Sequence, residues 1–168
     1  MGKRWAGKAV LFLAGQTVTL FGSSLVQYAI GWYITLTTQS GLMMTIATLC
    51  GFLPQVLVSL FAGVWADRFN RKALIILSDA MIAVCTALLA VLFSLGYSEL
   101  WLLFVISAVR SLGAGIQTPA VGAFLPELVP ADKLMRVNGV NASIQSVLMI
   151  VSPAAAGWLY GWLGLHPV

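Results

Sequence analysis

Residues 9–66 read AVLFLAGQTVTLFGSSLVQYAIGWYITLTTQSGLMMTIATLCGFLPQVLVSLFAGVWA, a run of 58 positions without a single Asp, Glu, Lys or Arg. One helical crossing of the hydrocarbon layer takes about 20 apolar residues. The run is therefore long enough for two crossings. A hydrophilic break, Thr37 to Gly41, divides it near its middle.

The composition of the whole chain extends this interpretation. Of 168 residues, 60% are hydrophobic and 8% charged, and the mean hydropathy is +0.97. A water-soluble domain carries about a quarter charged residues, so a secreted enzyme and a nucleic-acid-binding module are excluded. The apolar runs are continuous where the strands of a membrane β-barrel alternate. We expect an all-α polytopic membrane protein with five spans, at about 9–36, 42–66, 73–95, 100–124 and 137–165.

The basic residues predict the orientation. Lys and Arg in short loops stay on the cytoplasmic side of a membrane. With a cytoplasmic N-terminus, eight of the nine fall in cytoplasmic segments and none in the opposite loops, and Arg110 alone lies within a span. The eight residues are Lys3, Arg4, Lys8, Arg68, Arg71, Lys72, Lys133 and Arg136. We expect the chain to end on the far side, after an odd number of spans.

The most specific pattern joins the second and third spans and reads GVWADRFNRK, residues 63–72. A tight reversal there needs a residue that tolerates a left-handed backbone, a role that we assign to Asn70. Asp67 is placed to bond Arg68 or Arg71, or to face the N-terminus of another helix. An ordinary positive-inside hairpin is the alternative interpretation.

This run resembles the loop signature of the major facilitator superfamily, G-x-x-x-D-R-x-G-R-K. The matching positions are Gly63, Asp67, Arg68, Arg71 and Lys72, and Asn70 replaces the second glycine. The resemblance implies a cytoplasmic gate, in which Asp67 latches onto the opposite helical half of the carrier and releases when the carrier turns inward. It also implies that the chain, as given, lacks a sixth span and a whole second half.

Two charges lie inside the predicted spans, Asp79 in the third and Arg110 in the fourth. A central Arg costs about 2.5–3.5 kcal/mol on insertion scales, so it should face protein or water and have a partner. Asp79 lies roughly 10 Å and Arg110 roughly 18 Å from the cytoplasmic end. We expect the two to pair and to serve proton coupling; separate solvation in a cavity, or snorkelling, is the alternative to the pair. The group that carries the proton is Asp79 or lies in the missing half. Arg110 also resembles the Arg of the superfamily motif R-x-x-x-G-x-G, linked to proton transfer, although the glycines here come one position early.

The fifth span contains the sequence SPAAAG, residues 152–157. A proline within a membrane helix frees a carbonyl and bends the axis, and small neighbours let another helix pack closely. The segment resembles the antiporter signature G-P-x-x-G-G, matched at Pro153 and Gly157, with Ser152 and Ala156 replacing two glycines. A plain kink is the alternative.

Other segments resemble the macrolide-efflux and siderophore-exporter branch of bacterial carriers, namely Gln117 to Ala120 and the connection from Leu125 to Asn141, which we expect between the fourth and fifth spans. A cavity for bulky, mostly apolar substrates would use aromatic faces and a few hydrogen-bonding groups. Tyr28 with Trp32, and Asn141 with Gln145, are each one turn apart. An interfacial belt or lipid contact is equally compatible with the aromatic pair, and helix association with the amide pair.

Catalytic constellations are absent from the sequence. The one histidine, His166, is near the end, and no Gly-rich phosphate loop with a following Lys-Ser or Lys-Thr occurs. We expect no cofactor, and transport driven by an ion gradient. The resemblance implies the N-terminal part of a proton-coupled exporter of small amphiphilic compounds in the bacterial cytoplasmic membrane. Its expected partners are a small-molecule substrate, protons, the lipid bilayer and the missing C-terminal half, with no nucleic acid. A small oligomeric membrane protein acting as a structural or assembly partner is the alternative, and an intramembrane enzyme is disfavoured.

Overall fold

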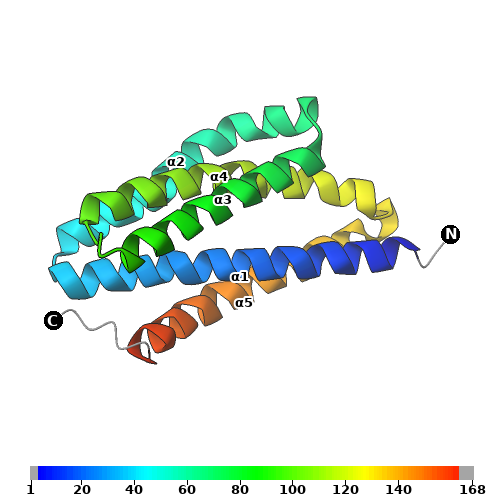
Figure 1. Ribbon diagram of the computed structural model, residues 1–168. Helices are drawn as coiled ribbons and strands as arrows, with labels where there is room; N and C mark the ends of the chain where they lie inside the picture. Colours follow the sequence, from blue (N-terminus) through cyan, green and yellow to red (C-terminus); the bar gives the residue numbers. More distant parts are fainter. Residues whose placement is uncertain (1–3, 163–168) are drawn as a thin grey trace.

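The computed structural model describes residues 4–162, which form five long helices (Figure 1). All five are long and apolar enough to cross a membrane. The five predicted helices are therefore confirmed. Lys3 and the end of the predicted fifth span, to Leu165, lie outside the described residues. The helices are α1 (Arg4–Thr38), α2 (Gly41–Arg68), α3 (Arg71–Ser94), α4 (Leu100–Leu128) and α5 (Ala131–Trp162).

Successive helices run in opposite directions (Figure 1). The start of α1, the α2–α3 turn and the α4–α5 turn share one end of the bundle, which we call the basic end because seven of the basic residues lie there. The other two turns and the end of α5 lie at the opposite end. The alternation is what a chain crossing a bilayer five times requires.

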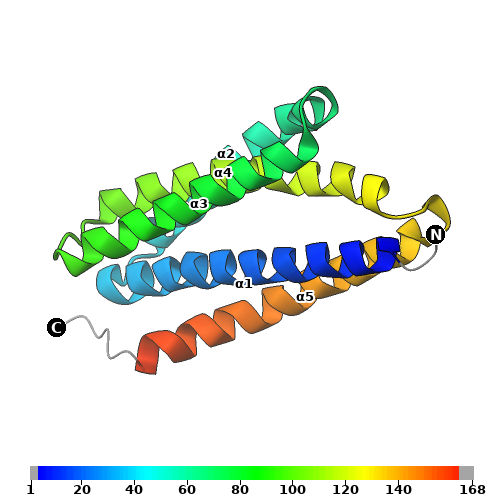
Figure 2. The ribbon, with the colours of Figure 1, turned by 45° about the vertical axis from the view of Figure 1, so that its right-hand side comes forward.

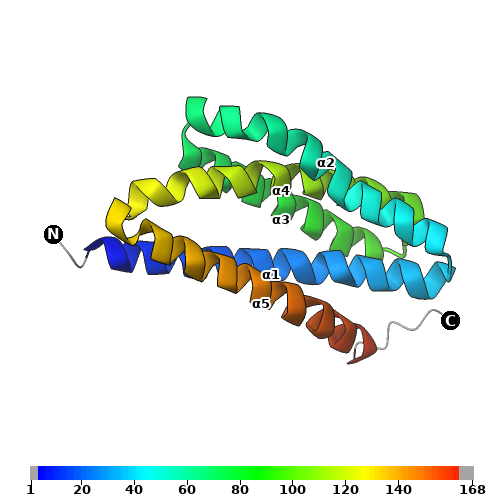
Figure 3. The same ribbon diagram turned by 180° about the vertical axis from the view of Figure 1, so that it is seen from behind.

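Helices α2, α3 and α4 form one layer, and α1 lies between this layer and α5 (Figures 2 and 3). Helix α4 is the central element. In its most apolar 18-residue stretch 44% of the residues are buried, against 11% in α2 and in α5. Many large apolar side chains on the outer faces are exposed, among them Leu11, Leu60 and Ile150. Such faces suit lipid, since a helix satisfies most of its backbone groups internally.

Glycines on α4 set the close packing of this layer. A methyl group added at Gly115 would lie 2.6 Å from the backbone oxygen of Gln55 on α2. One added at Gly113 would lie 2.8 Å from Cγ1 of Ile82 on α3. The missing side chain at Gly115 therefore lets α4 approach α2 to backbone contact, and that at Gly113 leaves room for the side chain of Ile82, as small residues do in membrane bundles.

Two apolar clusters lie at different depths and leave a polar zone between them. One cluster lies toward the opposite end and includes the buried residues Ile34, Leu103 and Ile106. The other lies toward the basic end and includes the buried residues Leu13, Ile75 and Leu125. Between the two clusters lie most of the polar side chains that make contacts between helices.

The connection between α4 and α5 is shorter than the sequence indicated. The predicted link contained Pro126 to Arg136, but α4 continues to Leu128 and α5 begins at Ala131. A helix does not have to end where the hydrocarbon ends. Polar residues continue it into water, and Asp132 in the first turn of α5 suits the positive end of the helix dipole.

Candidate functional site

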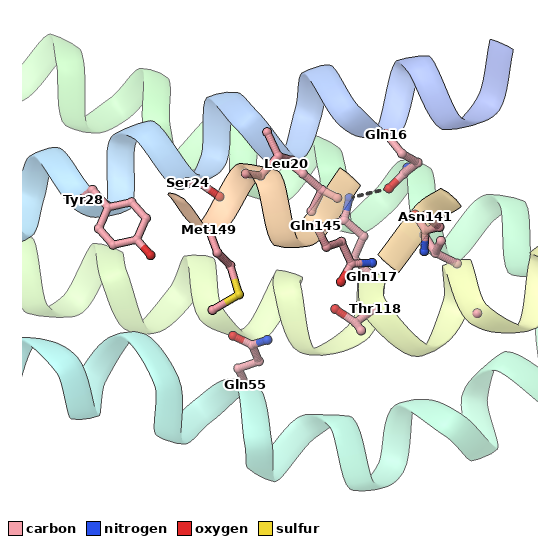
Figure 4. A pocket seen from close by; sticks show the side chains of 13 residues that line it. Gln16, Leu20, Ser24, Tyr28, Gln55, Gln117, Thr118, Asn141, Gln145 and Met149 are labelled. Carbon is pink, nitrogen blue, oxygen red and sulfur yellow. Dashed lines mark hydrogen bonds between the residues drawn. The ribbon is translucent and has the colours of Figure 1, made fainter. Parts of the chain in front are cut away.

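A polar cavity of about 500 Å³ lies between four helices, α1, α2, α4 and α5 (Figure 4). Its wall carries five carboxamide side chains, one phenol and two hydroxyl groups, and no carboxylate. The cavity therefore offers neutral hydrogen-bond donors and acceptors together with apolar surface. The lining residues are Gln16, Leu20, Ser24, Tyr28, Gln55, Gln117, Thr118, Val121, Gly122, Asn141, Gln145, Leu148 and Met149.

Three of the four residues predicted to line a substrate cavity lie in this wall: Tyr28, Asn141 and Gln145 (Figure 4). Trp32 does not. Its indole lies against α5, where a methyl group added at Gly157 would be 3.4 Å from its Nε1. Trp32 therefore lies outside this wall, because a helix residue one turn from Tyr28 faces whichever neighbour packs at its own level, and its place in a substrate cavity stays a prediction.

The predicted pair between Asp79 and Arg110 does not form. Arg110 is 3% exposed, and its Nη2 donates to the backbone oxygen and Oγ of Ser23 on α1, at 2.9 and 3.1 Å. Its Nε and Nη1 have no partner within the described residues. Asp79 instead accepts a hydrogen bond from Nε2 of Gln117. Each charge thus has a separate polar environment.

The helix register explains why the two charges stay apart. Arg71 meets Ala123 and Asp79 meets Gln117, so α3 and α4 run antiparallel with a fixed offset. That offset places Arg110 about two turns above Asp79 along α3, or about 10 Å. The guanidinium therefore reaches sideways to α1, because Ser23 lies at its own level.

Gln117 connects Asp79 to the cavity. The same Nε2 that donates to Asp79 also donates to Oε1 of Gln16, at 3.4 Å (Figure 4). Both glutamines are buried and both line the cavity. They were not among the predicted site residues. The sequence feature that could have identified both glutamines is an isolated carboxamide inside an apolar run. Gln55 has the same feature.

A second polar site lies at the basic end, where Arg71 joins three helices. Its Nε donates to the backbone oxygen of Ala66 at 3.0 Å, and its Nη1 to the backbone oxygen of Ala123 at 3.0 Å and to Glu127 at 2.8 Å. Charge-assisted hydrogen bonds of this kind are the strong ones. Arg71 therefore ties the turn between α2 and α3 to the end of α4. Glu127 was not predicted as a site residue.

Asp67 makes a weaker contact. Its carboxylate lies 3.8 Å from Nη2 of Arg71 one turn away, and its side chain is 77% exposed. The predicted local bond to Arg71 is thus present only as a long ion pair. Arg68 and Lys72 are exposed, and no atom lies within 4 Å of a methyl group added at Gly63. Asp67 keeps most of its hydrogen-bonding capacity free at the surface.

Asn70 does not adopt the left-handed backbone that we predicted. Its φ is −65° and its ψ is 111°, and its Oδ1 accepts a hydrogen bond from the backbone N–H of Ala73. Asn70 is therefore the N-cap of α3, a position that Asn favours because its side chain satisfies a free N–H. The reversal needs no left-handed residue, since both flanking residues of the turn are extended.

The small-residue segment of α5 packs on α1. Pro153 lies inside the helix, Ser152 and Ala156 are buried, and Gly157 contacts the ring of Trp32. The hydroxyl oxygen of Ser152 is buried without a partner among the described residues. This arrangement lets two helices touch closely beside a carbonyl that Pro153 cannot bond.

Comparison with known proteins places these features in context. A family profile described as Major Facilitator Superfamily matches residues 12–168. Macrolide efflux protein A of Streptococcus pyogenes is 36% identical over 164 residues, which cover 98% of this chain and 40% of that protein.

Two more distant relatives are named as a transporter and as a multidrug resistance protein. The staphyloferrin A transporter of Staphylococcus aureus is 24% identical over 87% of this chain and 37% of its own length. Multidrug resistance protein 2 of Bacillus subtilis is 24% identical over 91% of this chain and 37% of its own length. The chain thus spans about 40% of the length of the relatives that it matches. No solved structure matches the chain.

Proposed function

Because this chain belongs to the major facilitator superfamily, we propose that it forms part of a secondary active transporter that exports small amphiphilic compounds by proton antiport with alternating access. The observation that carries the proposal is the polar cavity between α1, α2, α4 and α5, which is bordered by apolar clusters at two depths. The remaining length of the carrier would supply the facing wall.

The cavity also supports a substrate class. Its five carboxamides, its phenol and its apolar residues suit a bulky compound with several hydroxyl or ether oxygens, since each such oxygen can accept from an amide N–H. Three relatives carry names that refer to macrolides, to staphyloferrin A and to multidrug resistance. We propose a macrolide-like substrate.

The basic end supplies the proposed gate. Arg71 holds α2, α3 and α4 together through Ala66, Ala123 and Glu127. Asp67 is exposed and only weakly paired, so its carboxylate is free to latch onto the other half of the carrier. We place this end in the cytoplasm because seven basic residues of the described chain gather there. The host membrane would be the bacterial cytoplasmic membrane.

The close contact of α5 with α1 supports the proposed antiporter role of Ser152, Pro153, Ala156 and Gly157. A proline in the helix and small residues at the contact allow the two helices to slide or bend against each other. In the proposal this contact rearranges as the carrier changes between its two states.

The test is proton-driven efflux by the protein expressed from its complete reading frame. A pH gradient is imposed across inside-out membrane vesicles. Uptake of radiolabelled erythromycin is then followed with and without a protonophore. The proposal expects uptake against the concentration gradient that collapses when the protonophore is added. Uptake that is unaffected by the pH gradient, or a complete product that forms a stable oligomer near 17.9 kDa per chain and moves no compound, would contradict it.

A further inference from the structure

The buried hydrogen-bond group formed by Asp79, Gln117 and Gln16 carries an inference beyond the carrier as a whole. Asp79 is the one acid of residues 4–162 that lies in the interior of a helix, because Asp67, Glu99, Glu127 and Asp132 all lie at helix ends. An acid within a membrane span is costly and typically belongs to a proton or ion pathway. Among the described residues its one hydrogen-bond donor is Gln117, on the neighbouring helix.

Gln117 has a side chain that can report on the state of this acid. In the structure its Nε2 donates to Asp79 and to Gln16, whereas its Oε1 makes no hydrogen bond with the described residues. An ionised carboxylate only accepts hydrogen bonds, and a protonated one also donates. The terminal torsion of a glutamine is broad and roughly two-fold, so the amide can turn either face to Asp79.

We propose that Asp79 is a proton-binding site of the carrier and that Gln117 is the positioning residue through which the cavity responds to its protonation. The inference rests on the proposed function, because it identifies where the driving proton is held. Gln117 neither gives nor takes the proton; it acts by how it presents its amide to Asp79 on one side and to the cavity on the other.

The step balances as a single proton transfer. A proton passes from solvent to a carboxylate oxygen of Asp79, which becomes neutral, and its new O–H donates to Oε1 of Gln117 after the amide has turned by half a revolution. The same half-turn moves Nε2 away from Asp79 and from its 3.4 Å contact with Oε1 of Gln16, and directs it to the cavity. Substrate that prefers one amide orientation is therefore bound more tightly in one protonation state, and the proton and the substrate influence each other reciprocally.

No other charged group substitutes for this contact. On α3, Arg71 lies about two turns away and is held by Glu127. On α4, Arg110 lies about two turns away and is bound to Ser23. On α1 the nearest charge is Lys8, about two turns from Gln16, and α2 carries no charge between Gly41 and Ala66. Its titratable Cys50 lies at the level of Ser111 instead.

The first experiment measures binding of radiolabelled erythromycin to the complete protein in vesicles as a function of pH. Asp79→Asn and Gln117→Leu are compared with Gln145→Leu, which removes a carboxamide from the same cavity wall without a bond to Asp79. In the parent protein a single competing proton changes the dissociation constant by up to about tenfold per pH unit. We expect both Asp79→Asn and Gln117→Leu to remove this pH dependence of the dissociation constant. Asp79→Glu should restore the pH dependence that Asp79→Asn removes.

The control should change affinity but keep the pH slope, because its amide does not contact the acid. A pH slope that is unchanged from the parent protein in both Asp79→Asn and Gln117→Leu overturns the inference. So does loss of the slope in Gln145→Leu to the same extent as in Gln117→Leu, because the effect would then belong to any cavity amide.

The second experiment needs no transport. Acidification of the purified complete protein is followed by infrared difference spectroscopy. We expect a protonated-carboxyl band that is missing in Asp79→Asn. The band should be shifted in Gln117→Leu, since the carboxyl of Asp79 has then lost its hydrogen-bond partner. A band that survives in Asp79→Asn, or one that is unshifted in Gln117→Leu, contradicts the inference. Failure of proton-driven efflux in the parent protein would instead contradict the proposed function and leave the infrared result standing.

Discussion

The basic end and the central cavity of this protein use polar groups in opposite ways. At the basic end the polar groups are charged side chains, partly exposed, from the start of α1, residues 63–72, the end of α4 and the start of α5. In the cavity, the polar groups are neutral amides and hydroxyls from four helices. The difference follows from solvent. A charge near water costs little, whereas inside the bundle an unpaired charge is expensive and a carboxamide can be satisfied by a neighbour.

Arg110 and Asp79 are the exceptions inside the bundle, and replacement of the more deeply buried Arg110 should have the largest effect. Arg110→Ala removes the link from α4 to α1 through Ser23. Hydrogen bonds to charged groups contribute about 1.5–3 kcal/mol, and loss of that energy from the rate-limiting state of transport decreases efflux about tenfold or more. The measurement is proton-driven erythromycin uptake into inside-out vesicles, normalised to the amount of protein in the membrane.

Arg110→Lys is the matched variant, because it keeps the charge and loses the planar guanidinium. We expect it to recover only part of the activity. Parent-level efflux by Arg110→Ala would show that the contact with Ser23 has no part in transport.

The packing of α2 on α4 should be sensitive at a single glycine. Gly115→Ala places a methyl group 2.6 Å from the backbone oxygen of Gln55, and a backbone cannot move aside as a side chain can. We expect a loss of about 1–3 kcal/mol in the free energy of unfolding, measured by denaturant titration in detergent. Gly122→Ala, on the same helix with no atom within 4 Å of the new methyl group, should be neutral or stabilising. Equal effects at the two glycines would contradict the described helix approach.

At the basic end, Arg71 should matter more than its neighbour. Arg71→Ala removes hydrogen bonds to Ala66, Ala123 and Glu127, and we expect a loss of about 1–2 kcal/mol in stability, since the site is partly exposed to water. Lys72→Ala removes an exposed charge and should change stability by less than about 0.5 kcal/mol. The measurement is the same titration, with Glu127→Ala and the double variant added to give the coupling energy. A coupling energy of zero would show that the ion pair contributes nothing.

The smallest expected effect is at Asn70. Asn70→Ala removes the cap of α3 and should cost about 1 kcal/mol, whereas Asn70→Asp keeps a capping oxygen and should cost less. Asn70→Gly should be slightly destabilising, by a few tenths of a kcal/mol. A glycine that stabilises the protein would favour the left-handed turn over the observed cap.

The sequence predicted the helices and the family better than the contacts. Five apolar runs and the 63–72 motif indicated five helices and the major facilitator superfamily, and the structure and the comparisons confirm both. Macrolide efflux protein A and the staphyloferrin A transporter also match the branch that the sequence resembles. These features are local: hydropathy follows from about 20 adjacent residues, and the motif occupies ten.

The contacts depend on helix rotation and register, which no local pattern carries. Depth alone suggested a pair between Asp79 and Arg110. The register of α3 and α4 instead places Asp79 beside Gln117 and leaves Arg110 facing Ser23. Trp32 lies outside the cavity wall for the same reason, because its indole packs against Gly157 of α5 while 43% of the residue stays exposed. Asn70 failed because two residue roles, N-cap and left-handed turn, share the same residue preference.

Alternating access of the cavity is the central claim, and cysteine labelling tests it most directly. Thr118, in the cavity wall, is replaced by Cys in the complete protein after Cys50 and Cys85 have been changed to Ser, and a membrane-impermeant maleimide is applied to sealed vesicles of either orientation. Leu60→Cys, on the outer face and 69% exposed here, serves as the lipid-facing control. The account predicts that reactivity of the cavity cysteine passes from one side of the membrane to the other when pH or erythromycin is changed, while the control stays unreactive. Reactivity confined to one side under every condition would contradict it.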